Sequence, residues 1–382
     1  MDFNLSEREL EVQKLAREFA NNEIAPVIAK YDEEGKFPME LAQKMGEMGF
    51  LGIIFPEEYG GAGFTTTEYA IIIEEISKID PSMGLTVASH NGLCSNHIFS
   101  FSTEALKQKY MPDLTSGKKL GAWGLTEAVS GSDAAGMATT AEKKGDHYLI
   151  NGSKMFITQG NVGETAVVTA VTDKENRKRG ISAFVMEKGM KGFTANKMDN
   201  KLGMRSSDTA ELFFDNVEVP AENLIGVEGE GFIQAMKILD GGRIAIAALS
   251  VGIAQGALDL ALKYAKERKQ FGKSLSSFQG IQFKLSDIAM EVEAARLLTF
   301  RAAKLKENGQ PFAMEASMAK YYASEVACRA TNESLQIHGG YGYMKEFMIE
   351  KLYRDVKLMT IGEGTSEVQK MVISRNLLEI YN

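Results

Sequence analysis

Cysteine and histidine are scarce in this 382-residue sequence. The two cysteines, Cys94 and Cys328, lie far apart with no paired spacing, which excludes a disulfide framework and a cysteine zinc site and fits a reducing compartment. The four histidines include no HExxH motif or similar pair of ligands. The sequence therefore predicts neither a structural nor a catalytic metal.

Excess basic charge and long apolar runs are missing as well. The net charge of −8 argues against a nucleic-acid-binding protein, which needs a basic face. No apolar run approaches the roughly 20 residues that span a bilayer. The first residues, MDFNLSEREL, have a helical pattern and not the charged and apolar segments of a leader. We therefore expect a soluble, cytoplasmic protein without membrane insertion.

Proline is rare after residue 220, where only Pro311 occurs. Because proline breaks the interior of a helix at a cost of about 3 kcal/mol, its absence permits long helices. Alanine, methionine and leucine recur there at helical spacing. The pattern predicts a C-terminal four-helix bundle in residues 231–382, with helices at 231–270, 276–307, 312–340 and 364–381.

The first third of the sequence also has helical patterns. Ser6 and Glu9 form a capping box at the start of the first helix. Residues 1–121 are therefore predicted to form an N-terminal α-helical domain. Turn-rich stretches, PEEYGGAGF and DPSMG, separate its further predicted helices, which are 39–49, 67–79 and 103–113.

The middle of the sequence, residues 122–230, has strand patterns. Asn151-Gly152 between two alternating runs predicts a hairpin with a type I′ turn. The runs 165–172 and 180–187, split by DKENRKRG, predict two strands, and 209–219 predicts a further strand pair. The fold class is therefore α+β, with a central antiparallel β-sandwich or barrel-like domain between the two helical domains.

The common nucleotide-binding motifs are absent, but other segments suit a ligand site. No GxGxxG follows a strand and no GxxxxGK[ST] occurs. Residues 123–133, WGLTEAVSGSD, form a polar loop that could donate hydrogen bonds to a flat heterocycle, or an ordinary connection. Residues 268–279 place Arg268 and Phe271 at a helix end. There the guanidinium of Arg268 suits bidentate contact with a pyrophosphate. The alternative is that it is an ordinary charged group on the solvated surface.

Two glycine-rich segments follow near the C-terminus. In residues 336–343, QIHGGYGY, glycines after a helix let the backbone approach a ligand, or they simply end the helix. Residues 361–369, IGEGTSEVQ, place Glu363 between two glycines before a helix that Thr365 or Ser366 would cap. The carboxylate then lies on a thin segment beside a ligand, or it is itself a capping group.

Together these segments closely resemble the acyl-CoA dehydrogenase family of flavoproteins, in its bacterial short-, medium- or branched-chain type. The likeness runs from residue 3 to about residue 378. Ala128 departs from the family, which usually has proline after Thr-Glu, and this should alter loop stiffness more than chemistry. The matching blocks are GLTEAVSGSD, NGSKMFIT, LDGGR, ERKQFGK with the later Gln279, QIHGGYGY and IGEGTSEVQ.

The resemblance implies an FAD site between the β domain and the C-terminal helices of a homo-oligomer, typically a tetramer. Contacts to the flavin ring are implied for Trp123, Leu125, Thr126, Gly131, Ser132, Phe156, Ile157 and Thr158. Contacts to its pyrophosphate and adenine, partly across a subunit interface, are implied for Arg268, Phe271, Gln279, Gln336, Gly339 and Gly340. Further cofactor contacts are implied for Thr365 and Glu367, and substrate contacts for Ser132, Asp240, Arg243 and Gly364.

The resemblance further implies α,β-dehydrogenation of an acyl-CoA thioester to the 2-enoyl-CoA. Glu363 would remove the α-proton while flavin N5 takes the β-hydride, and desolvation should raise the basicity of Glu363. A flavin ribityl hydroxyl and the backbone N–H of Glu363 would stabilise the developing enolate. Electrons would pass to an electron-transfer flavoprotein. The isovaleryl-CoA branch instead carries its base in the LDxxR helix, where this sequence has Gly242.

Two other functions and one question of substrate shape stay open. An acyl-CoA oxidase would hand electrons to oxygen, and such oxidases usually have an added C-terminal domain. A non-catalytic acyl-CoA-binding scaffold would be expected to lose the base or the flavin loop. Gly362 stands where many straight-chain members have tyrosine. The space that it leaves is filled either by neighbouring side chains or by a branched or cyclic acyl group.

Overall fold

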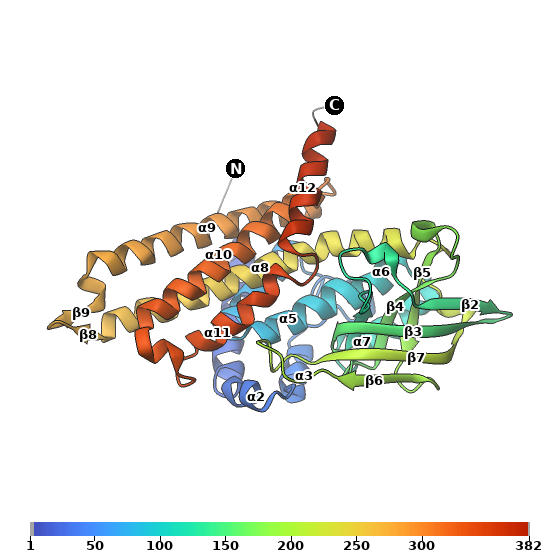
Figure 1. The fold of residues 1–382 in the computed structure, drawn as a ribbon, viewed down its shortest axis with the longest axis horizontal. Coiled ribbons are helices and arrows are strands. Elements are labelled where there is room, and N and C mark those ends of the chain that lie inside the picture. Colours follow the sequence, from blue (N-terminus) through green and yellow to red (C-terminus); the bar gives the residue numbers. More distant parts are fainter. Residues whose placement is uncertain (1–3, 381–382) are drawn as a thin grey trace.

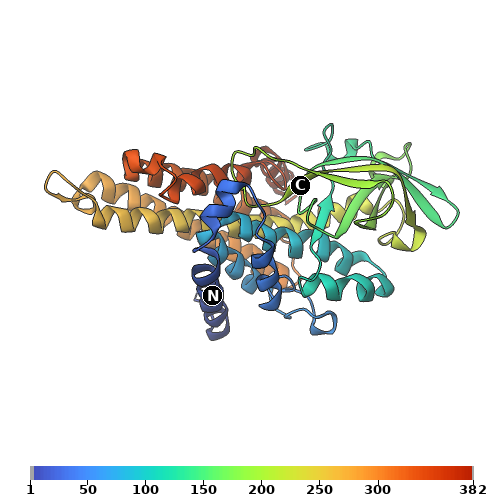
Figure 2. The same ribbon diagram turned by 90° about the horizontal axis from the view of Figure 1, so that it is seen from below.

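The computed structural model describes residues 4–380 and arranges helices, a sheet and helices in that order along the chain (Figure 1). The curled sheet lies at one end of an elongated molecule. Long helices run from it to the opposite end, where a small ribbon of β8 (Lys269–Gln270) and β9 (Lys273–Ser274) lies. Seen from below, the N-terminal helices pack on one side of the C-terminal helices (Figure 2). The predicted α–β–α fold is confirmed.

The N-terminal helices follow the local sequence signals closely. The capping box at Ser6 and Glu9 is present. The predicted helices at 39–49, 67–79 and 103–113 form within two residues of the expected bounds. The predicted break at DPSMG is confirmed at Asp80, whose extended backbone ends one helix, but the same residue caps a further, unpredicted helix whose first residue is Pro81. The helices are α1 Glu7–Phe19, α2 Ile28–Glu34, α3 Met39–Glu47, α4 Thr66–Ile79, α5 Pro81–Ser89, α6 Asn96–Phe101 and α7 Glu104–Thr115.

The middle segment forms a seven-stranded sheet in the order β1-β4-β2-β3-β7-β6, with β5 on the free side of β4. Most neighbouring strands are antiparallel, but β4 pairs in parallel with both β1 and β2. The runs at 165–172 and 180–187 form strands as predicted. The strands are β1 Gly121–Gly124, β2 Thr140–Lys144, β3 His147–Thr158, β4 Thr165–Val171, β5 Ile181–Glu187, β6 Phe193–Lys197 and β7 Thr209–Pro220.

The predicted hairpin at Asn151-Gly152 is wrong, and so is the strand pair within 209–219. Both segments are single strands, β3 and β7, which pair with each other through a bulge at this point. Asn151 and Asn216 exchange hydrogen bonds across the bulge. At Gly152, where φ is 142°, a Cβ atom would overlap Thr139. Glycine therefore serves a bulge here and not a turn.

The C-terminal helices lie within three residues of their predicted bounds, apart from a short helix that was not predicted, α11 (Ile349–Asp355). They are α8 Gly231–Glu267, α9 Gln279–Glu307, α10 Ala313–His338 and α12 Ser366–Ile380, and residue 381 lies outside the described residues. The first three pack together, with α4 against α8 and α9. Helix α12 packs on α10 and projects from the body (Figure 1).

Helix α8 is the central helix of the core. By length and composition it is apolar enough to cross a membrane, but 83% of its most apolar window is buried inside the protein. The expectation that no segment reaches this length and hydropathy was therefore wrong. Burial against α4, α5, α9 and α10 explains the apolar composition of α8.

Candidate active site

A short turn between α11 and α12 carries Glu363. Backbone dihedrals are left-handed at two successive residues, with φ of 52° at Glu363 and 92° at Gly364. The next residue, Thr365, caps α12 by accepting from the Val368 N–H at 3.3 Å. Leu358 O accepts from the N–H groups of Ile361 and Gly362, whereas the N–H of Glu363 has no acceptor within residues 4–380. The turn therefore presents both a carboxylate and a free N–H.

Glu363 is partly buried, and its carboxylate oxygen Oε2 is buried against α8. Its Oε2 has no hydrogen-bond partner in the described part of the chain. A Cβ atom at Gly242 would overlap this oxygen, so the carboxylate fills the space beside the glycine. Burial raises the pKa of Glu363 to about 7, and the positive charges of Lys320 and Arg243 oppose that rise. Glu363 is thus a carboxylate that can take up a proton near neutral pH.

The predicted substrate residues on α8 lie beside Glu363. Arg243 is buried, and its Nη1 donates to Asp240 Oδ1 at 2.5 Å and to Ser317 Oγ at 3.3 Å. Burial raises the pKa of Asp240 although Arg243 lies next to it. Arg243 Nε has no partner within the described residues. The pair therefore keeps one unused donor near the carboxylate.

A π-helical turn at His90–Ser95 faces this part of α8. A Cβ atom at Gly242 would lie 3.4 Å from Leu93 Cδ2. Behind it, the buried Tyr69 hydroxyl donates to Ala88 O at 2.7 Å. π-helical turns within helices are frequent at functional sites. Leu93 and Tyr69 were not predicted as site residues, and no local motif marks them.

The predicted flavin loop, residues 123–132, is fixed to β3 by a buried ion pair. Lys154 donates to Leu125 O at 3.1 Å and to Glu127 Oε1 at 2.7 Å. Glu127 in turn accepts from the N–H groups of Ala138 and Thr139. Burial lowers the pKa of Lys154 to about 8, and Glu127 opposes the shift. The loop is therefore rigid at its base, while Gly131 and Ser132 at its tip are exposed.

Residues 156–158 lie beside this loop, because the Met155 N–H donates to Thr126 O at 2.8 Å. Phe156 has a left-handed φ of 61° and is 64% exposed, whereas Ile157 next to it is buried. Left-handed backbone at a phenylalanine costs free energy of roughly 1–3 kcal/mol, and such outliers concentrate at ligand sites. The exposed ring beside a polar loop fits a flat heterocyclic ligand such as a flavin.

Two neutral histidines hold β1, the strand that leads into the flavin loop. His90 accepts from the Gly121 N–H at 3.1 Å, and His97 accepts from Trp123 Nε1 at 3.0 Å. The opposite ring nitrogens of these histidines contact Leu114 O and Gln234 Oε1. Each ring therefore accepts at Nδ1 and donates at Nε2. Burial lowers the pKa of both histidines to about 4.

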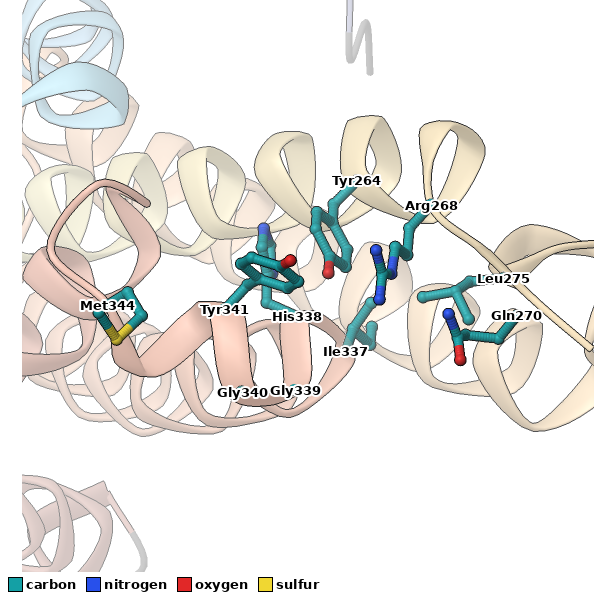
Figure 3. A pocket seen from close by; sticks show the side chains of 10 residues that line it. All are labelled: Tyr264, Arg268, Gln270, Leu275, Ile337, His338, Gly339, Gly340, Tyr341 and Met344. Atoms are coloured by element: carbon teal, nitrogen blue, oxygen red, sulfur yellow. The ribbon is translucent and has the colours of Figure 1, made fainter.

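The second group of predicted cofactor residues forms a different pocket, of about 440 Å³, at the far end of α8 and α10 (Figure 3). The guanidinium of Arg268 lies 5.1 Å from the ring of Tyr341, and His338 stacks on Tyr264 at 4.3 Å. Arg268 forms no salt bridge within the described residues. A Cβ atom at Gly339 or Gly340 would meet nothing within 4 Å. An unpaired guanidinium beside open backbone fits a pyrophosphate.

Other members of this group are exposed at the same end. Phe271 is 93% exposed at the tip of the β8–β9 ribbon, and Gln279 and Gln336 are exposed on α9 and α10. This end lies opposite the sheet (Figure 1). One chain therefore brings Glu363, Gly364, Asp240 and Arg243 together, and the flavin loop with Phe156–Thr158. It does not bring the Arg268 group to either of them.

Among residues 4–380, no group of three or more His, Cys, Asp or Glu side chains could hold a metal ion.

The sequence analysis did not predict the buried Lys320 as a site residue, although its Nζ donates to Gly364 O at 2.7 Å. A sequence signal existed, because this lysine interrupts the alanine-rich buried face of α10 at Ala316, Ala319 and Ala323. A charge on such a face is almost always paired or functional.

Comparison with known proteins gives consistent matches along the chain. Family models for the N-terminal, middle and C-terminal domains of acyl-CoA dehydrogenase match residues 6–118, 122–217 and 229–378. The short-chain specific acyl-CoA dehydrogenase of Clostridium acetobutylicum is 50% identical over 374 residues, 98% of this chain and 99% of that protein.

Solved structures agree in fold and in extent. Butyryl-CoA dehydrogenase of Megasphaera elsdenii is 46% identical and superposes with a TM-score of 0.97, over 99% of this chain and 100% of that chain. A chain from a structure concerning the electron transferring flavoprotein of Acidaminococcus fermentans, and flavin-based electron bifurcation, is 49% identical with a TM-score of 0.98. The superposition covers 99% of this chain and 100% of that chain.

Proposed function

Since this chain belongs to the acyl-CoA dehydrogenase family, we propose that it converts a short-chain acyl-CoA to the 2-enoyl-CoA with Glu363 as the base. The protein is an FAD-dependent oxidoreductase that dehydrogenates acyl-CoA thioesters and passes the electrons to an electron-transfer flavoprotein. The short acyl chain in the proposal is supported by the name of the Clostridium relative.

The assignment of the base rests on the surroundings of Glu363. A general base works best when its pKa lies near the working pH, and burial raises the pKa of Glu363 to about 7. The buried Oε2 has no partner within the described residues, so it is free to accept a substrate proton. The unpaired N–H of Glu363 suits the thioester oxygen, where negative charge develops as the proton leaves.

FAD, when bound, accepts the hydride of the β-carbon. Trp123, Leu125, Thr126, Gly131, Ser132 and Phe156–Thr158 would hold its ring, and Thr365 and Glu367 would contact the cofactor as well. Arg268, Phe271, Gln279, Gln336, Gly339 and Gly340 would hold its pyrophosphate and adenine. Ser132, Asp240, Arg243 and Gly364 would contact the acyl-CoA. The exposed ring of Phe156 and the unpaired guanidinium of Arg268 support these two cofactor subsites.

We further propose that the site is completed by a second copy of the chain, within a homotetramer. The support is that the two groups of cofactor residues lie far apart in one chain: the β8–β9 ribbon lies at the end away from the sheet, whereas the flavin loop and Phe156–Thr158 adjoin β1 and β3 of the sheet. Apolar side chains exposed on the projecting helix α12, Met371, Leu378 and Ile380, would pack on another copy. We place the domain boundaries after residues 121 and 230, and the protein in the cytoplasm, where Cys94 and Cys328 would remain reduced.

A panel of acyl-CoA substrates tests the function directly. The purified protein should be yellow, and a short-chain acyl-CoA should bleach the flavin absorbance faster than a long-chain one. Glu363→Gln should keep FAD and still bind acyl-CoA while turnover falls by several orders of magnitude. A variant that keeps more than about a tenth of the rate would rule out Glu363 as the base. Fast reoxidation by oxygen without a flavoprotein acceptor would favour the oxidase alternative.

A further inference from the structure

We propose that Lys320 is a positioning residue for Glu363. Its buried ammonium group holds the carbonyl of Gly364 and thereby fixes the turn that carries the base. The proposal rests on the proposed role of Glu363, and it adds a residue on a different helix, α10, which would act on the reaction without touching the substrate.

The geometry ties Lys320 to the turn alone. The residue is fully buried, and its Nζ donates to Gly364 O at 2.7 Å. Within residues 4–380 it forms no salt bridge, unlike the buried Lys154 and Lys351, which pair with carboxylates. A buried ammonium without a carboxylate partner is costly to maintain. Lys320 is therefore placed for something other than an ordinary ion pair.

The turn needs such support because its backbone is strained. Glu363 has a left-handed φ of 52°, which non-glycine residues adopt only when their surroundings stabilise it. A second buried side chain acts on the same turn, since Gln369 Nε2 donates to Gly364 O at 2.9 Å and to Glu363 O at 3.3 Å. The two donors fix the peptide planes on the C-terminal side of Glu363, and thus the direction of its carboxylate.

Lys320 also acts on the charge of the base. The titratable groups that face Glu363 are Lys320 on α10, Arg243 on α8 and Tyr69 on α4. Arg243 already pairs with Asp240, so Lys320 is the cation whose charge is not balanced by a salt bridge. Burial lowers the pKa of Lys320 to about 8, and the positive charge of Arg243 lowers it further. The negative charge of Glu363 opposes this shift, with smaller contributions from Glu325 and Glu367. The ammonium therefore favours the ionised, proton-accepting form of Glu363.

Two substitutions separate the hydrogen bond from the charge. Lys320→Met removes both, whereas Lys320→Gln removes the charge and retains a donor. Ser324→Ala is the matched control, because Ser324 lies one turn further on the same buried face of α10 and donates only to Tyr321 O. For each protein kcat and KM are measured between pH 5.5 and 9.5, together with FAD content and Tm.

Because Glu363 must be ionised, kcat rises with pH through its pKa, and removal of a nearby cation moves this rise to higher pH. We expect an upward shift on the order of one pH unit in both lysine variants. The plateau kcat should fall about tenfold or more in Lys320→Met and less in Lys320→Gln, with KM little changed. Ser324→Ala should match the wild type in both the pH profile and the plateau.

A purely structural role gives a different result. It lowers Tm while leaving the pH profile and the plateau kcat of the folded, FAD-containing enzyme unchanged, and that outcome overturns the proposal. If Lys320→Met does not fold, the shift in Lys320→Gln decides. Glu363→Gln, measured in parallel, separates a failure of the proposed base from a failure of the proposed role of Lys320. Substantial activity in that variant refutes the base itself, whereas an inactive Glu363→Gln with unshifted lysine variants refutes only the role of Lys320.

Discussion

The carboxylate of Glu363 occupies the space that a Cβ atom at Gly242 would need. Two positions far apart in the sequence therefore compete for one place in the fold. The absence of a side chain at Gly242 on α8 is the condition under which the Glu363 carboxylate, carried by the turn before α12, fits. This relationship agrees with the existence of a family branch that carries its base in the same α8 motif.

A methyl group at position 242 should therefore disturb catalysis without disturbing the fold. In Gly242→Ala the added Cβ displaces the Glu363 carboxylate, and we expect kcat to fall about 10- to 100-fold with FAD content unchanged. Gly241→Ala is the matched control, because its Cβ would meet only the flexible end of Lys306 at 3.1 Å. Equal turnover in the two variants would show that the carboxylate has room to move.

Arg268 should matter for the cofactor although it lies far from Glu363. Arg268→Ala removes the guanidinium from the far pocket, so FAD occupancy and the stability of the oligomer should fall together. The control is Arg329→Ala, which removes an exposed guanidinium paired with Glu291. Gel filtration at low concentration, with the flavin-to-protein ratio of each peak, measures both quantities. Full flavin retention by Arg268→Ala would exclude a cofactor role.

The shape of the acyl pocket can be tested at Gly362. A Cβ atom at position 362 would contact only Leu358, at 3.5 Å or more, so the backbone can accommodate a side chain at this position. We expect Gly362→Tyr to lose isobutyryl- and cyclohexanecarboxyl-CoA preferentially over butyryl- and hexanoyl-CoA. The loss in kcat/KM should correspond to about 1–3 kcal/mol. A wild type that prefers butyryl-CoA about tenfold, with no change in the variant, would mean that protein side chains fill the space.

Stability should fall in mild acid through His90 and His97. Both have a folded-state pKa of about 4, below the ordinary value, so the unfolded chain binds more protons between that value and 6.5. Their contribution is fully present above pH 6.5 and is lost as the pH falls through 4. It amounts to about 3 kcal/mol for each histidine. Urea unfolding from pH 7.5 to 4.5, followed by the fluorescence of the single tryptophan, measures the loss.

In His97→Gln the slope of stability against pH should be smaller than in the wild type, although stability at pH 7.5 is also lower. His147→Gln is the control, because this histidine lies near the surface and contacts the exposed Asp146. An unchanged slope in His97→Gln would place the acid sensitivity elsewhere in the chain.

Much of the fold was predictable because single residues mark helix boundaries. Ser6 and Glu9 mark the first helix, and the scarcity of proline after Pro220 marks the long ones. Asn151-Gly152 was misinterpreted because the same dipeptide suits a turn and a bulge. The choice between them depends on the partner strand β7, which is distant in sequence. Asp80-Pro81 was taken for a break although it also starts a helix.

Part of the site was accessible from motifs, but its supporting contacts were not. Glu363 stands out by its flanking glycines. The contacts of Lys320 with Gly364, and of Lys154 with Glu127, join elements that only the folded chain brings together. The separation of β3, which carries Phe156, from the C-terminal end of α8, where Arg268 lies, is likewise a property of the long helix α8 and not of any local pattern.

That placement has a genetic consequence if the two ends of each chain serve different sites. A chain with Arg268→Ala and a chain with Glu363→Gln would each be inactive alone, but a mixed dimer would contain one site built only from undamaged halves. Its other site would carry both defects. Co-expression of the two inactive alleles should therefore restore activity, whereas a single chain carrying both substitutions should remain silent with either partner. Restored activity would thus show that two chains contribute residues to one active site.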